Sequence, residues 1–140
     1  MIYLLDTDHI SELQGIAAAG RRLTVRLGEI APDDYGTTIV TFEEQIRGRL
    51  AQAAASKAVA ASDVTFYARL NGTLRFYQNI AWQYTQEAAL RCEALRSAKI
   101  RVGTQDLKIA GIALSAGAML TRNTRDFAQI PDLLIEDWTA

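Results

Sequence analysis

The sequence predicts an α/β protein built on a parallel sheet. Short apolar or β-branched runs at residues 2–5, 37–40, 118–121 and 133–135 have the length and composition of buried strands. Segments with apolar residues at helical spacing separate these runs, and alternation of strands with helices is typical of parallel βαβ units. With 140 residues, 49% of them hydrophobic, the chain is expected to form one domain spanning residues 1–140.

Composition and charge narrow the class of protein. The net charge of −1 provides no overall positive field for nucleic acid, although a local basic rim can suffice. Cys92 is the single cysteine, which excludes an internal disulfide and suits a reducing compartment. No apolar run approaches the roughly 20 residues that span a bilayer, and the first residues have no signal-peptide pattern. We therefore expect a cytoplasmic protein without membrane contact.

Acidic residues follow the first predicted strand. Asp6 comes directly after the run at residues 2–5, and Thr7 and Asp8 precede a helix that is predicted from His9 onward. Either Thr7 or Asp8 is expected to cap this helix, and Gly20 is expected to end it. A cap does not explain Asp6, which a buried strand would otherwise avoid. Because open parallel sheets bind ligands at the carboxyl ends of their strands, Asp6 is a candidate site residue.

A second pair of acids follows the predicted strand at residues 37–40. Thr41 is expected to be the N-cap of the next helix, and Glu44 three residues later completes a capping box. In this interpretation Glu43 and Glu44 stabilise the positive end of the helix dipole. The same position lies near Asp6 in any parallel sheet, so a structural and a functional role are compatible for these adjacent residues.

The middle of the chain is predicted to be helical. An alanine-rich stretch at residues 53–61 permits a helix, and apolar residues at helical spacing follow it. Asn71 and Gly72 also suit a β-hairpin turn, but apolar and polar residues alternate poorly on both sides, so we favour a helical hairpin. Residues 80–82 can form a short strand. Four aromatic residues in this region can form either a homodimer face or an intramolecular core: Phe66, Tyr67, Phe76 and Tyr77.

Two further helices are predicted in the last third of the chain. Thr85 is expected to cap a helix that places Cys92 on its apolar face, which makes Cys92 a core residue rather than a nucleophile. Asp106 lies in the first turn of a second helix, which is expected to end at Gly117. Polar residues then follow the strand predicted at residues 118–121.

The acids at strand ends and helix starts can meet at one edge of the sheet. They are Asp6, Asp8, Glu44, Asp106 and Asp126. Clustered carboxylates repel one another unless a cation is present, and an all-oxygen set suits Mg²⁺ or Mn²⁺ rather than zinc. Such a site can activate a water and neutralise a phosphodiester under attack. Four neighbouring cations can hold phosphates: Arg47, Lys108, Arg122 and Arg125. The alternative is a set of separate, solvated helix caps and turn acids.

Four segments resemble the PIN-domain family, in particular the VapC-type toxin ribonucleases of toxin–antitoxin pairs. They are residues 4–8 (LLDTD), 43–48 (EEQIRG), 103–110 (GTQDLKIA) and 120–127 (LTRNTRDF), and the similarity extends to residues 135–138 (IEDW). The resemblance implies a three-layer α/β/α fold with a short parallel sheet of about four or five strands and a helical hairpin arm that often dimerises. It also implies a Mg²⁺- or Mn²⁺-dependent endoribonuclease that cleaves RNA and is blocked by a cognate antitoxin.

The resemblance assigns roles to individual residues. Asp6 and Asp106 match metal-binding acids, and Glu44 matches a further acid because it stands four residues before Gly48. Asp126 matches the last and more variable acid. Supporting positions are matched by Asp8, Thr121 and Asn123. Glu43 is an acid that the family pattern does not require, and whether Glu43 or Glu44 faces the metal stays open, as does the choice between Asp126 and Asn123.

Two other functions fit parts of the sequence. A haloacid-dehalogenase-like phosphatase would use Asp6 as nucleophile and Asp8 as general acid–base, but it would leave Glu44 and Asp106 without a role. Hydrolysis of a generic aryl phosphate would favour it. A non-catalytic RNA-binding or partner-binding module would have purely structural acids, and would cleave nothing with any divalent ion.

Overall fold

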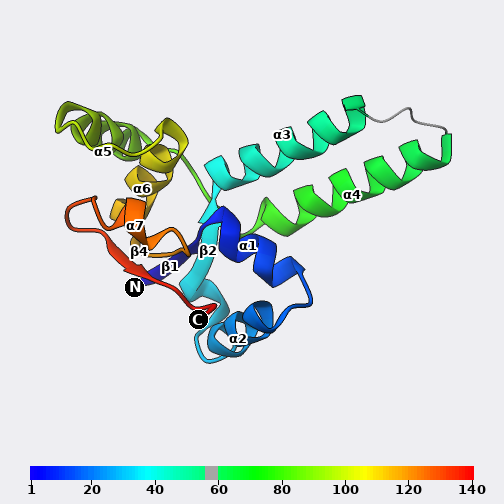
Figure 1. Cartoon of the computed structure of the whole chain (residues 1–140), viewed down its shortest axis with the longest axis horizontal. Coiled ribbons are helices and arrows are strands. Elements are labelled where there is room, and N and C mark those ends of the chain that lie inside the picture. Colours follow the sequence, from blue (N-terminus) through cyan, green and yellow to red (C-terminus); the bar gives the residue numbers. More distant parts are fainter. Residues whose placement is uncertain (56–59) are drawn as a thin grey trace.

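The computed structural model describes residues 1–55 and 60–140 and contains one five-stranded sheet. The strands are β1 (Ile2–Leu5), β2 (Tyr35–Thr38), β3 (Ala81–Trp82), β4 (Gly117–Leu120) and β5 (Leu134–Glu136). Their order is β3-β2-β1-β4-β5, and every neighbouring pair is parallel. The predicted parallel sheet is confirmed, with β1 at its centre (Figure 1).

Helices connect the strands and cover both faces of the sheet (Figure 1). They are α1 (Thr7–Gln14), α2 (Ala18–Leu27), α3 (Ile39–Ala55), α4 (Ala60–Gln78), α5 (Gln86–Ser97), α6 (Thr104–Ala116) and α7 (Thr124–Phe127), with a 3₁₀ turn at Pro32–Asp34. The helices α3 and α4 project from the rest of the molecule as a long arm. Among the described residues, none of these helices has the length and apolar character that crossing a membrane requires.

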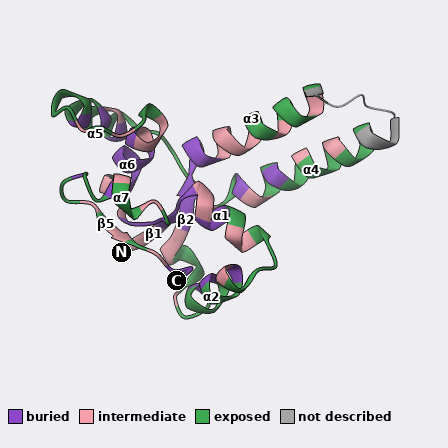
Figure 2. Ribbon diagram, viewed as in Figure 1, coloured by how far each residue is buried: buried purple, intermediate pink, exposed green. Residues whose placement is uncertain are grey.

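The two faces of the sheet bury separate clusters of side chains, as expected because successive residues of a strand point to opposite faces. Leu4 and Met119 pack with the buried residues of α5 and α6, including Cys92, in one cluster. Leu5 and Leu120 pack with the buried residues of α1 and α2 in the other. Figure 2 shows both layers of buried residues on either side of the central strands. The three-layer α/β/α architecture is therefore confirmed, and Cys92 is a core residue.

Several predicted boundaries are wrong by a few residues, for local reasons. The second strand ends at Thr38 rather than at residue 40, because α3 begins immediately after it. Thr41 is therefore inside the helix, and its backbone N–H donates to the hydroxyl of Thr38 at 3.1 Å. The side chain of Thr38 therefore caps the start of α3, in place of the predicted capping box of Thr41 and Glu44. Similarly, Asp6 caps α1 by accepting the Thr7 N–H, so neither Thr7 nor Asp8 is the cap.

The first helical segment is divided differently from the sequence-based expectation. Helix α1 ends before Gly15, and Gly20, which was expected to end a helix, lies inside α2. A Cβ at Gly20 would stand 2.1 Å from the carbonyl oxygen of Glu12. Only glycine therefore allows α1 and α2 to cross this closely. In contrast, the helix of Asp106 does end at Gly117, which has a φ of +154°.

The arm confirms the helical interpretation of the middle of the chain. Helix α4 runs through Asn71 and Gly72 without a turn, and the hairpin consists of α3 and α4. The alanine-rich prediction at residues 53–61 falls partly outside the described residues. Tyr77 is only 2% exposed and stacks edge-on with Phe42 at 5.1 Å, so it belongs to the core rather than to a dimer face. Tyr67 is 64% exposed, which leaves the predicted homodimer face as a prediction for this part of α4.

Candidate active site

Asp6 is the buried centre of the acidic site. It follows β1 directly and is only 6% exposed. One carboxylate oxygen, Oδ1, accepts the backbone N–H of Thr7 at 2.8 Å, and Oδ2 lies 2.9 Å from the hydroxyl of Thr121, just beyond β4. Since β1 and β4 are adjacent parallel strands, their carboxyl ends bring these two residues together from opposite ends of the chain.

Electrostatic repulsion links Asp6 to the other acids. Burial, the neighbouring Asp8 carboxylate and the more distant Asp106 together raise the pKa of Asp6 from its ordinary 3.8 to about 7. The pKa of Asp106 is also raised, mainly by burial and then by the negative charges of Glu44, Asp126 and Asp8. All five predicted acids take part in these mutual effects. Near neutral pH the site therefore favours uptake of either a proton or a cation.

The acids approach one another without forming a closed metal cage. Within residues 1–55 and 60–140, no group of three carboxylate, imidazole or thiol side chains is arranged so that it could hold a metal ion as it stands. The donor atoms that line the edge of the sheet are nevertheless all oxygens, which is the preference of Mg²⁺ and Mn²⁺.

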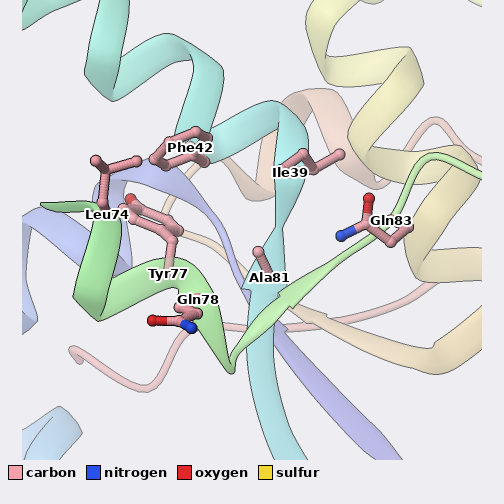
Figure 3. Close-up of a pocket in the computed structure, with 7 residues that line it drawn as sticks. All are labelled: Ile39, Phe42, Leu74, Tyr77, Gln78, Ala81 and Gln83. Atoms are coloured by element: carbon pink, nitrogen blue, oxygen red, sulfur yellow. The ribbon is translucent and has the colours of Figure 1, made fainter.

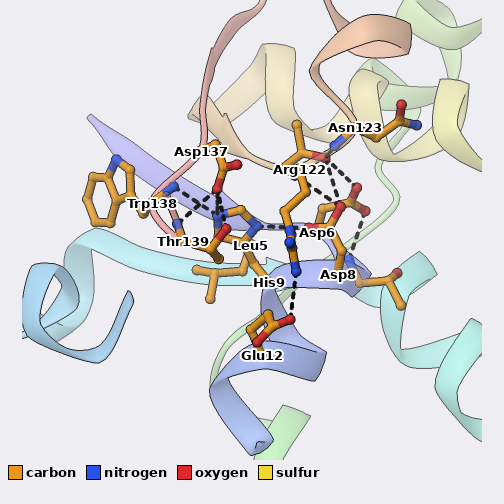
Figure 4. Close-up of polar contacts among 12 residues, drawn as sticks. Leu5, Asp6, Asp8, His9, Glu12, Arg122, Asn123, Asp137, Trp138 and Thr139 are labelled. Atoms are coloured by element: carbon orange, nitrogen blue, oxygen red, sulfur yellow. Dashed lines mark hydrogen bonds and ion pairs between the residues drawn. The ribbon is translucent and has the colours of Figure 1, made fainter. Parts of the chain in front are cut away.

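Asp8 ties α1 to the turn after β4. Its Oδ2 accepts the backbone N–H of Arg122 at 3.0 Å (Figure 4). The same oxygen lies 3.3 Å from the Thr121 hydroxyl. Its Oδ1 lies 2.8 Å from Nδ1 of His9. Both oxygens of Asp8 are therefore engaged by the protein, and its supporting role stays a prediction.

The two adjacent glutamates of α3 face different partners. Glu44 accepts a hydrogen bond from the Thr7 hydroxyl at 2.7 Å, next to Asp6. Glu43 accepts bonds from Gln105 at 3.0 Å and Arg47 at 2.9 Å, and these two contacts hold its pKa below the usual range. The geometry therefore favours Glu44 over Glu43 as the site acid.

Asp126 and Asn123 act together in the loop after β4. The Asn123 side-chain amide donates to Asp126 at 3.1 Å, and the Asn123 backbone N–H donates to the Thr121 hydroxyl at 2.9 Å. The turn thus connects Asp126 to Thr121 and, through it, to Asp6. Both residues of the predicted pair lie at the site, with Asp126 supplying negative charge towards Asp106.

Two of the four predicted phosphate-binding cations are paired with acids. Arg47 pairs with Glu43 at 2.9 Å, and Arg122 pairs with Glu12 at 2.7 Å. Exposed pairs of this kind contribute at most about 1 kcal/mol, so a phosphate can compete for either arginine. Lys108 borders a cavity of about 470 Å³ beside Glu43 and Arg47. Arg125 is exposed on α7, next to Asp126.

Three residues of the site were not identified by sequence reasoning. Thr7 was considered only as a helix cap, yet its hydroxyl holds Glu44. Gln105 engages Glu43 from the first turn of α6. His9, named only as the start of a predicted helix, is completely buried beside Asp8. The position of His9, one residue after a site acid, was the one available hint.

Comparisons with known proteins identify the family. No family model matches the sequence. Ribonuclease VapC1 of Haemophilus influenzae is 30% identical over 141 residues, which cover 99% of each protein. The solved structure of VapBC-1 from nontypeable Haemophilus influenzae matches with a TM-score of 0.71, 24% identity and full coverage of both chains. DNA-bound VapBC from Salmonella typhimurium matches with a TM-score of 0.68 and 25% identity, covering 99% of this chain and 98% of the other. Because the similarity to VapC1 extends over both full lengths and the fold agrees, this chain belongs to the VapC ribonuclease family of PIN-domain proteins.

Proposed function

We propose that this protein is an endoribonuclease that hydrolyses RNA phosphodiester bonds with the help of Mg²⁺ or Mn²⁺. The observation that carries the proposal is the buried Asp6, whose pKa is raised to about 7 within a group of acids drawn from distant segments. The family relationship supports the substrate, since the curated relative is named a ribonuclease. The site also uses Glu44 and Asp106, for which the phosphatase alternative has no role.

The oxygen donors fit a divalent ion. We assign Asp6 and Asp106 as its ligands, with Glu44 and Asp126 completing the acidic site, because a cation relieves the repulsion that raises the pKa of both aspartates. When bound, the ion supplies an activated water and neutralises charge on the phosphate.

The surrounding residues orient the acids and handle the proton. The Thr7 N–H and the Thr121 hydroxyl hold the two oxygens of Asp6, so its carboxylate cannot rotate freely. The Thr7 hydroxyl fixes Glu44 in the same way. In the absence of an ion, the raised pKa makes the half-buried Asp106 bind a proton more readily than an ordinary aspartate, and a bound cation would displace that proton.

Basic residues around the acids would hold the RNA backbone. Lys108 and Arg125 flank the acidic cluster from α6 and α7, and Arg47 and Arg122 can exchange their surface carboxylate partners for phosphates. This local rim supplies the attraction that the net charge of −1 does not.

We further propose that the protein is the toxin of a toxin–antitoxin pair and binds a cognate antitoxin. The solved relatives are VapBC structures, and one is described as a member of a family of toxin–antitoxin systems. A cavity of about 320 Å³ lies between α3, α4 and β3, lined by apolar side chains that include Ile39, Phe42 and Leu74 (Figure 3). Leu74 is 50% exposed beside it, so an apolar segment of a partner would bury surface there.

The test is cleavage of a mixed cellular RNA pool by the purified protein with Mg²⁺, Mn²⁺ or EDTA. Cutting is expected with either ion, none with EDTA, and none by the Asp6→Asn variant. The matched pair Glu44→Gln and Glu43→Gln separates the site acid from its neighbour: the first is expected to lose cleavage and the second to lose far less.

Three results would contradict the proposal. Cutting that persists in EDTA would refute metal dependence, and cutting retained by Asp6→Asn would refute the site. Release of phosphate from a generic aryl phosphate would favour the phosphatase instead. If folded protein cuts no RNA, titration calorimetry with Mn²⁺ decides between a missing target and a site without metal.

A further inference from the structure

The single histidine of the sequence connects two distant segments at the edge of the active site. His9 lies in α1 and is 0% exposed. Its Nδ1 is 2.8 Å from Oδ1 of Asp8, and its Nε2 is 3.1 Å from the backbone nitrogen of Trp138, near the C-terminus (Figure 4). Both ring nitrogens are therefore occupied, although no catalytic step proposed above uses the ring.

The partners of the ring fix its protonation. The backbone N–H of Trp138 can only donate, so Nε2 of His9 must be the acceptor and carries no proton. In a neutral ring the proton is then on Nδ1, where it donates to the carboxylate of Asp8. A doubly protonated ring would lose the bond from Trp138. Asp137, whose Oδ1 is 3.6 Å from Nε2, instead accepts from the N–H and hydroxyl of Thr139.

Contacts with β1 and α2 hold Trp138 and Thr139 in place. The Trp138 ring packs against Tyr3 at a centroid distance of 4.7 Å, and the guanidinium of Arg26 lies 4.4 Å above it. Arg22 donates to the carbonyl oxygen of Thr139 at 2.8 Å. The backbone N–H that faces His9 is thus held by β1 and α2, and is a fixed reference for the imidazole.

The hydrogen bonds that start at His9 continue through Asp8 to the catalytic acids. Asp8, oriented by His9 through Oδ1, accepts the Arg122 N–H through Oδ2 and lies within reach of the Thr121 hydroxyl. Thr121 contacts Asp6 at 2.9 Å. A rotated Asp8 carboxylate would release this turn and with it the hydrogen bond to Asp6.

We propose that His9 is a positioning residue of the active site, which orients Asp8 against the backbone of Trp138 and thereby holds the Thr121 turn against Asp6. This role rests on the ribonuclease function proposed above. Residues that orient site acids from behind typically change activity by about 10- to 100-fold when replaced.

The first experiment measures the ring directly, without any substrate. Because the sequence has one histidine, ¹⁵N-histidine labelling of the full, untagged chain gives the signals of His9 alone. We expect the proton on Nδ1 and none on Nε2, as the two hydrogen bonds require. Asp8→Ala should move the Nδ1 resonance and leave Nε2 unprotonated. A proton on Nε2, or an Nδ1 resonance indifferent to Asp8→Ala, would overturn the proposal.

The second experiment compares two replacements that each keep one half of the ring's contacts. In His9→Asn the side-chain amide can occupy the position of Nδ1 and still donate to Asp8. In His9→Gln the amide reaches the position of Nε2 and can accept from Trp138. We expect His9→Gln to lower kcat by at least about tenfold with little change in KM, and His9→Asn to recover most of this loss.

Thermal unfolding separates positioning from simple stability. Equal loss of activity in His9→Asn and His9→Gln, in proportion to their unfolding temperatures, would show a structural role and overturn the proposal. A wild-type protein that cuts no RNA would contradict the proposed function instead. In that case the position of the Nδ1 proton and its response to Asp8→Ala still decide whether His9 orients Asp8.

Discussion

Replacing Asp6 by asparagine should make the metal-free protein more stable at alkaline pH while it abolishes cleavage. The raised pKa means that the folded protein holds a proton on Asp6 that the unfolded chain releases from about pH 3.8 upward. Whenever the folded state binds more protons, the free energy of unfolding falls as the pH rises. The stability contributed by the protonated carboxyl is therefore present at low pH and is lost as the pH rises through about 7.

The magnitude follows from the pKa. One pKa unit corresponds to about 1.4 kcal/mol, so about two units of titration between pH 5 and the pKa of about 7 should cost the wild-type protein roughly 3 kcal/mol. The variant lacks this loss. Its amide oxygen still accepts the Thr7 N–H. Its amide nitrogen must donate to the Thr121 hydroxyl, which itself donates to Asp6 in the wild-type protein, and this change costs about 1 kcal/mol. Over the full shift from 3.8 to about 7 the wild-type protein loses roughly 4 kcal/mol, so Asp6→Asn should exceed wild type by about 3 kcal/mol at about pH 8.

Urea denaturation at a series of pH values, in EDTA, measures this difference. The free energy of unfolding of Asp6→Asn minus that of wild type should grow by roughly 3 kcal/mol between about pH 5 and pH 8. A constant difference would refute the raised pKa. A variant that is less stable than wild type at about pH 8 would show that ionised Asp6 stabilises the fold and that the repulsion argument is wrong.

Three other perturbations test the packing and the site. Gly111→Ala should lower the free energy of unfolding by about 1–3 kcal/mol in urea, because a Cβ there would stand 2.6 Å from the carbonyl oxygen of Ala88; an unchanged midpoint would contradict close packing of α5 on α6. Thr121→Val should cost about 2 kcal/mol and weaken cleavage, because it leaves Asp6 without its hydroxyl partner; full activity would exclude that role. Mn²⁺ should raise the unfolding temperature more at about pH 8 than at about pH 5, because at the lower pH the ion must compete with protons for acids whose pKa is raised. Asp106→Asn should remove this rise, and an equal rise in that variant would place the ion elsewhere.

Sequence patterns predicted the elements whose boundaries are set locally. Thr85 caps α5 through its own side chain, and Gly117 ends α6, both as expected. The boundary between β2 and α3 could not be found in this way, because Thr38 satisfies the helix start from inside the strand and leaves no loop. The prediction that Gly20 ends a helix was also wrong. Glycine is required at this position because α1 approaches α2 closely there, and not because α2 ends.

The acidic site was predictable in outline because parallel topology alone brings strand ends together. The choice between Glu43 and Glu44 was not, since it depends on which side chain faces Thr7 and which faces Gln105. The role of His9 was further out of reach. It requires the backbone of a residue 129 positions away to face a particular ring nitrogen.

The order of the strands has a consequence for how the protein is synthesised. The central strand β1 leaves the ribosome first, but its neighbour β4 and the Thr121 partner of Asp6 follow more than a hundred residues later. Until β4 has left the ribosome, β1 can pair with β2 on one side only, and the acids cannot assemble. The proposed nuclease is therefore inactive until that stage of its synthesis, and a cell has this interval in which to supply a partner that covers the site.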